Sequence, residues 1–150
     1  MRNPIDEQDT IVFSQRSSGL KVVVADDSAL VRERLTGSLV GISGVTVVGS
    51  ANCAAEAVDT FNSTPADLFI LDIQMPGGSG IDVLREIKLR RSSAVVIMFT
   101  NHFDLHYRQK CIEFGADHFL SKASDLEQLV RIVEELATSK TTGEWDSKLT

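Results

Sequence analysis

Short apolar runs alternate along the chain with segments in which apolar residues recur every three or four positions. The apolar runs lie at 21–25, 45–50, 67–71, 94–99 and 117–121. The segments of helical period lie at 28–40, 54–62, 79–90, 105–115 and 125–137. This alternation is typical of α/β proteins with a parallel sheet. We therefore predict five strands and five helices in a domain at 20–138, with polar tails at 1–19 and 139–150.

The apolar runs have no polar alternation, which indicates strands that are covered by helices on both faces. Right-handed crossovers then favour a doubly wound sheet. The second run is the weakest and ends in glycine and serine, so we place it at an edge of the sheet. Gly115 is expected to end the fourth helix in a left-handed conformation, and Ser79 to cap the third.

Composition and charge narrow the class of protein. The 150 residues are 43% hydrophobic and 24% charged, which is ordinary for one soluble domain. No segment approaches the roughly 20 apolar residues of a membrane span, so we predict a cytoplasmic protein without membrane contact. The net charge of −6 opposes nucleic-acid binding. Cys53 and Cys111 fall in helical patterns without CxxC spacing, which favours buried thiols.

Polar side chains follow four of the apolar runs at their carboxyl ends. Asp26 and Asp27 follow the first run, Asp72 the third, Thr100 the fourth and Lys122 the fifth. Because ligands of open α/β sheets bind outside the carboxyl ends of the strands, we expect these side chains to converge.

Converging carboxylates would repel one another unless they shared a cation. Oxygen ligands without cysteine or histidine select a hard cation, and Mg²⁺ commonly takes one or two carboxylates with waters and a phosphate. The hydroxyl of Thr100 and the ammonium of Lys122 suit the oxygens of a phosphoryl group. Asp72 is then the expected nucleophile, forming an aspartyl phosphate.

At these residues the sequence resembles the receiver domain of two-component response regulators. The matching pieces are ADD at 25–27, LDIQMPGGSG at 71–80, FT at 99–100, GAD at 115–117 and SK at 121–122. The resemblance covers about residues 20–138. It implies a flavodoxin-like doubly wound sheet with the strand order 2-1-3-4-5.

The resemblance also implies individual roles. Asp26 and Asp27 match the acidic pair that holds Mg²⁺, and Asp72 matches the phosphorylation site and a third ligand. Gln74 matches the position whose backbone carbonyl ligates the metal. The remaining matches are the switch hydroxyl Thr100, the switch aromatic Phe119 and the phosphate-contacting Lys122. Phe119 is equally suited to a plain core position.

The sequence departs from the family at two positions. Lys122 is followed by Ala123, where receivers usually have proline after a cis peptide bond, so the lysine either keeps a costly cis bond or is re-aimed on a trans bond. Asn101 stands where a small residue is usual. By resemblance, Gln74 and His102 flank the path of the hydrolytic water, so we expect Gln74, Asn101 and His102 to set the dephosphorylation rate.

The predicted function is that of a phosphoacceptor signalling domain with self-catalysed phosphorylation and dephosphorylation, not a classical enzyme. Few residues follow 138, so a stand-alone receiver is expected, which relays phosphate or regulates a downstream protein target. Its phosphate donor would be a sensor histidine kinase or a histidine phosphotransfer protein. One alternative is an interaction module that acts without phosphorylation. A small-molecule phosphatase is disfavoured, because Asp72-Ile73-Gln74 lacks a DxD arrangement.

Overall fold

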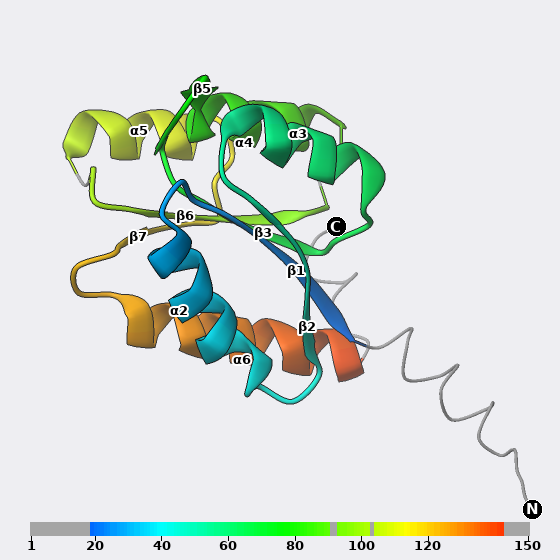
Figure 1. Cartoon of the computed structure of the whole chain (residues 1–150). Helices are drawn as coiled ribbons and strands as arrows, with labels where there is room; N and C mark the ends of the chain where they lie inside the picture. Colours follow the sequence, from blue (N-terminus) through cyan, green and yellow to red (C-terminus); the bar gives the residue numbers. More distant parts are fainter. Residues whose placement is uncertain (1–18, 91–92, 103, 143–150) are drawn as a thin grey trace, which may run out of the picture.

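The computed structural model of the chain describes residues 19–90, 93–102 and 104–142. Five parallel strands form a sheet in the order β2-β1-β3-β6-β7 (Figure 1). These strands are β1 (Leu20–Ala25), β2 (Val45–Ala51), β3 (Leu68–Leu71), β6 (Val95–Thr100) and β7 (His118–Ser121). The predicted order 2-1-3-4-5 and the edge position of the second strand are confirmed.

Among the described residues, five helices cover the two faces of the sheet, as predicted (Figure 1). In Figure 1, α2 and α6 lie on one side of the sheet and α3, α4 and α5 on the other. The helices are α2 (Ala29–Val40), α3 (Ala54–Ser63), α4 (Gly80–Arg90), α5 (Leu105–Glu113) and α6 (Leu126–Thr142).

Successive residues of the central strands enter opposite cores, because side chains alternate across a pleated strand. In β3, Leu68 and Ile70 pack on the α2 and α6 side, whereas Phe69 and Leu71 pack on the α3, α4 and α5 side. All four side chains are at most 1% exposed. Burial on both faces explains why the runs contain no polar alternation.

Gly115 ends α5 as predicted, with a φ of +96°. Its N–H donates to the carbonyl of Ile112 at 3.0 Å, and the next N–H, from Ala116, donates to Cys111 at 2.9 Å. These two bonds form the Schellman arrangement that satisfies the last carbonyls of a helix.

The last helix, α6, continues to Thr142, four residues beyond the predicted domain end at 138. Ser139 is buried at 5% exposure, and the Lys140 ammonium lies 3.1 Å from Asp67 Oδ1 at the start of β3. These contacts hold the last turn of the helix against the sheet. The segment from residue 143 onward lies outside the described residues, as do residues 1–18.

A short hairpin follows β3 and was not predicted. Its strands are β4 (Gln74–Met75) and β5 (Gly78–Ser79), joined through Gly77 with a φ of +76°. The Ser79 hydroxyl then accepts the Ile81 N–H at 3.0 Å, which confirms its predicted cap of α4. The hairpin therefore returns the chain directly from the end of β3 to the next helix.

The two cysteines occupy different environments. Cys111 is fully buried on α5, and burial raises the pKa of its thiol to about 11. Cys53 is only half-buried, contrary to prediction, because it precedes α3 as its N-cap and its Sγ accepts the Glu56 N–H at 3.5 Å.

Candidate functional site

The sheet ladder continues one residue past the ends of three strands. The N–H of Asp26 donates to Ala51 O at 3.0 Å, that of Asp72 to Ala25 O at 3.0 Å, and that of Lys122 to Thr100 O at 3.0 Å. These backbone bonds fix three polar residues at one edge of the sheet. The predicted convergence of strand ends is therefore present.

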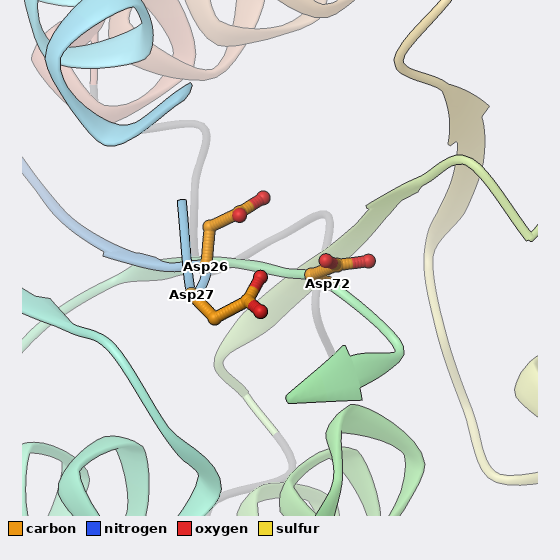
Figure 2. Close-up of side chains that lie close together, drawn as sticks. All are labelled: Asp26, Asp27 and Asp72. Atoms are coloured by element: carbon orange, nitrogen blue, oxygen red, sulfur yellow. The ribbon is translucent and has the colours of Figure 1, made fainter. Parts of the chain in front are cut away.

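Three carboxylates gather at this edge (Figure 2). Asp26 and Asp27 follow β1 and Asp72 follows β3, and one oxygen of each lies within 4.8 Å of the others. Asp26 and Asp72 are only 1% and 5% exposed, whereas Asp27 is exposed. In the described part of the chain, no other group of three potential metal ligands is found.

Lys122 bridges the two buried carboxylates. Its Nζ lies 2.9 Å from Asp72 Oδ2 and 2.5 Å from Asp26 Oδ2, with the lysine side chain 13% exposed. The described residues contain no cis peptide bond, so the Lys122–Ala123 bond is trans. The lysine therefore reaches the acidic cluster without proline at 123.

Burial and pairing act on the same groups in opposite directions. Desolvation raises the pKa of Asp26 above its usual 3.8, although the Lys122 ammonium and the Ser28 N–H act to lower it. Desolvation lowers the pKa of Lys122, but hydrogen bonds to Asp26 and Asp72 outweigh it and leave the pKa above 10.5. The lysine is thus held as a cation between the carboxylates.

Two further contacts hold the turn after β1, and sequence reasoning missed both. Arg32 Nη1 donates to the backbone carbonyl of Asp26 at 2.7 Å. The Ser28 N–H donates to Asp26 Oδ1 at 2.9 Å, and the Ser28 hydroxyl caps α2. A serine before a helical pattern is a readable cap signal, but nothing in the pattern links Arg32 to Asp26.

The cluster opens into a cavity of about 570 Å³. Its walls are formed by Asp27, Ser28, Val31, Asp72, Gln74, Met75, Pro76, Asn101, His102 and Lys122. The three candidates for control of dephosphorylation, Gln74, Asn101 and His102, therefore face the same space as Asp72. The His102 ring also makes an edge contact with Tyr107, at 5.9 Å between ring centres.

The two predicted switch residues are buried in strands β6 and β7. Thr100 is fully buried at the end of β6, and its hydroxyl accepts the His102 N–H at 3.0 Å. Phe119 on β7 is 9% exposed and lines a separate cavity of about 380 Å³ with residues of α5 and α6. As far as the described residues show, neither side chain lines the cavity at Asp72.

The donor set fits Mg²⁺. All three side chains offer carboxylate oxygens, one of them at the open side of the cluster, and the cavity leaves room for waters and a phosphate. Thiol and imidazole ligands, which would favour zinc or copper, are missing from this group.

The chain belongs to the response regulator receiver domain family, whose model matches residues 22–134. Receiver domains are phosphoacceptor signalling domains of two-component systems; they bind Mg²⁺ at an acidic pocket and interact with histidine kinases.

Several full-length regulators are similar to this chain. The response regulator UvrY of Escherichia coli K12 is 30% identical over 117 residues, which cover 78% of this chain and 54% of that protein. GacA of Pseudomonas aeruginosa is 27% identical over 78% of this chain and 55% of its own length. The chain thus spans about half the length of these relatives. The expectations of a stand-alone receiver and of no nucleic-acid partner stay predictions.

The same family is found among solved structures. The receiver domain of the putative response regulator NarL from Mycobacterium tuberculosis superposes with a TM-score of 0.74 at 29% identity, covering 81% of this chain and 98% of that one. A LuxR-family response regulator from Aurantimonas superposes with a TM-score of 0.74 at 27% identity, covering 87% of this chain and 98% of that one.

Within the described ranges, every helix is too short or too polar to cross a membrane.

Proposed function

We propose that Asp72 accepts a phosphoryl group from a phosphohistidine donor, a histidine kinase or a histidine phosphotransfer protein. One observation carries this proposal: a carboxylate that is 5% exposed stands at a strand end, paired with Lys122 and grouped with Asp26 and Asp27 beside an open cavity. A buried carboxylate in a strand connection contributes little to packing. Its cost is consistent with a chemical role.

In the proposed reaction, a carboxylate oxygen of Asp72 forms a bond to phosphorus as the bond from phosphorus to the histidine nitrogen breaks. Asp26, Asp27, Asp72 and the backbone carbonyl of Gln74 would hold Mg²⁺, which supplies positive charge to the phosphoryl oxygens. Lys122 would keep one hydrogen bond in the cluster and offer another to the phosphoryl group. The chain then acts by self-catalysed phosphoryl transfer on its own residue.

Signalling would follow from a change around the site. The Thr100 hydroxyl would turn toward the phosphoryl group, and Phe119 would respond at the surface formed by α5, β7 and α6. A downstream protein would read that surface. The position of Phe119 at a cavity in this surface supports the idea. The alternative is an interaction module whose contacts do not depend on phosphate.

Intact mass spectrometry after incubation with acetyl phosphate and Mg²⁺ tests the proposal. The wild type should gain the mass of one phosphoryl group, and Asp72→Asn should gain none while retaining its fold. Asp59→Asn, which alters an exposed carboxylate of α3, is the matched control and should behave as wild type. A phosphorylated Asp72→Asn protein would rule out Asp72 as the acceptor. Phosphorylation that persists in excess chelator would contradict the metal assignment.

A further inference from the structure

The half-buried loop at 121–125 carries Lys122 into the site and is extensively hydrogen-bonded. Each of its five backbone N–H groups has an acceptor. In order from Ser121, the acceptors are Asp125 Oδ2 (2.8 Å), Thr100 O (3.0 Å), Ser121 Oγ (3.1 Å), Ser121 O (3.4 Å) and Ser121 O (2.9 Å). Four of these bonds join atoms within the loop, and every one of the four has Ser121 as a partner.

Two side chains supply bonds that the backbone alone would not make. The Ser121 hydroxyl accepts the Ala123 N–H, so this hydrogen bond connects the residues directly before and after Lys122. The Asp125 carboxylate, directly before α6, accepts the Ser121 N–H and ties the end of β7 to the start of the helix. Proline at 123 has no N–H to donate, so the first of these bonds requires a residue such as Ala123.

The position of the Lys122 backbone matters because its ammonium has two partners on different strand ends. Nζ must reach Asp26 after β1 and Asp72 after β3 at once. A lysine side chain has several rotatable bonds, and fixing it in one geometry costs conformational entropy. Hydrogen bonds that fix the backbone of Lys122 therefore reduce the range of positions available to its ammonium.

We propose that Ser121 and Asp125 are positioning residues, which hold Lys122 on a trans peptide so that its ammonium bridges Asp26 and Asp72. The consequence for phosphoryl transfer rests on the proposed function. The consequence for the ammonium itself does not, and the two are measured separately.

The first measurement is hydrogen exchange between the Lys122 ammonium and water, followed by ¹⁵N NMR on the metal-free protein at one fixed pH. The signal is assigned by its loss in Lys122→Met. Exchange should be about five- to tenfold faster in Ser121→Ala and Asp125→Ala, the factor expected for losing one hydrogen bond. Ser121→Thr and Asp125→Asn keep an acceptor and should restore slow exchange. Exchange in both alanine variants within about twofold of wild type would overturn the proposal.

Ser124→Ala is the matched control within the loop. Its hydroxyl bonds Asp125 Oδ1 at 3.1 Å and not the oxygen that holds Ser121, so exchange should match wild type. Far-ultraviolet circular dichroism checks that each variant is folded. If either alanine variant unfolds, the conservative variants Ser121→Thr and Asp125→Asn still test the proposal. Loss of the slowly exchanging Lys122 signal in both of them would contradict it.

The second measurement is the initial rate of phosphorylation by acetyl phosphate with saturating Mg²⁺. Ser121→Ala and Asp125→Ala should be slowed by a similar factor, with Ser124→Ala and Ser121→Thr close to wild type. Faster ammonium exchange with an unchanged rate would overturn the link to phosphoryl transfer. A wild type that gains no phosphate would refute the proposed function, while ammonium exchange would still test the positioning roles.

Discussion

Asp26 is nearly inaccessible to water, and its carboxyl group makes the stability of the folded protein depend on pH. Because burial raises its pKa above 3.8, the folded protein binds the proton more tightly than the unfolded chain does. The stability contribution is therefore full below pH 3.8 and is lost as the pH rises through the folded pKa. The ionised form of Asp26 therefore destabilises the metal-free fold relative to the protonated form.

Asp26→Asn should accordingly stabilise the metal-free protein at pH 7, because the buried group can no longer ionise. The gain over wild type should shrink as the pH is lowered from 7 toward 4. Urea unfolding in the presence of chelator measures both. Asp59→Asn controls for the loss of one carboxylate, and a variant less stable than wild type at pH 7 would show that the pairing with Lys122 outweighs desolvation.

Asn101 and His102 add bulk to the cavity beside Asp72. Hydrolysis of an aspartyl phosphate needs a water in line with the bond to phosphorus, so side chains at this wall should limit its approach. Combining Asn101→Ala with His102→Ala should shorten the phosphorylated lifetime several-fold, which corresponds to roughly 1 kcal/mol in the barrier. The phosphorylated lifetime is measured as the loss of acid-labile phosphate after the donor is removed. His106→Ala, which removes the other histidine packed on Tyr107, should leave the lifetime unchanged.

At the residue scale, the sequence allowed prediction of side chains that end a strand, because strand ends in a parallel sheet share one edge. Asp26, Asp72 and Lys122 were found in this way. Arg32, Ser121 and Asp125 were not, since their contribution depends on hydrogen bonds whose partners meet only after the loops are folded.

At the scale of elements, the hairpin after β3 places a glycine against the backbone of the phosphoacceptor candidate. A Cβ on Gly80 would lie 1.8 Å from the carbonyl oxygen of Asp72, and the Gly80 N–H donates to Ile73 O at 2.7 Å. The start of α4 and the end of β3 therefore pack too closely to leave room for a side chain at position 80. The position of Asp72 depends on this close approach.

Gly80→Ala should therefore destabilise the protein by about 2–3 kcal/mol and slow phosphorylation, because the Asp72 backbone must move. Gly37→Ala is a direct control: a Cβ there meets no atom within 4 Å, and α2 should gain about 0.5–1 kcal/mol from the better helix former. Denaturant unfolding compares the two variants. Equal stability of Gly80→Ala and wild type would mean that the hairpin relaxes freely.

The elements that sequence reasoning found and missed differ in length and polarity. Central strands and helices have enough apolar positions to show a period. The two-residue strands β4 and β5 are too short to show one, and the last turn of α6 reads TSKTT, whose residues are polar. That turn is held by Lys140 and Asp67, 73 positions apart, which no local pattern reveals.

At the scale of the whole molecule, the acidic cluster and the α5, β7 and α6 surface are connected through β6 and β7. These strands pair in parallel, with Met98 opposite Phe119 and Thr100 opposite Ser121. Thr100 therefore lies beside the residue that begins the Lys122 loop, and two positions along the strand from the pair that contains Phe119. A change at the Thr100 hydroxyl has a short structural route to the surface.

Thr100 variants test whether phosphate is read along this route. The hydroxyl accepts the His102 N–H and still has a hydrogen to donate, which a phosphoryl oxygen on Asp72 would attract. Thr100→Val keeps the shape of the side chain and removes that donor, whereas Thr100→Ser keeps the donor. Both variants should accept phosphate. Amide hydrogen exchange from Asn101 to Ser121 should change on phosphorylation in wild type and Thr100→Ser, and change little in Thr100→Val, because the bias toward the active arrangement is lost. Identical exchange changes in wild type and Thr100→Val would show that this hydroxyl does not transmit the effect of phosphorylation to the surface. The remaining route would then run through Lys122, because its loop connects the acidic cluster to the start of α6.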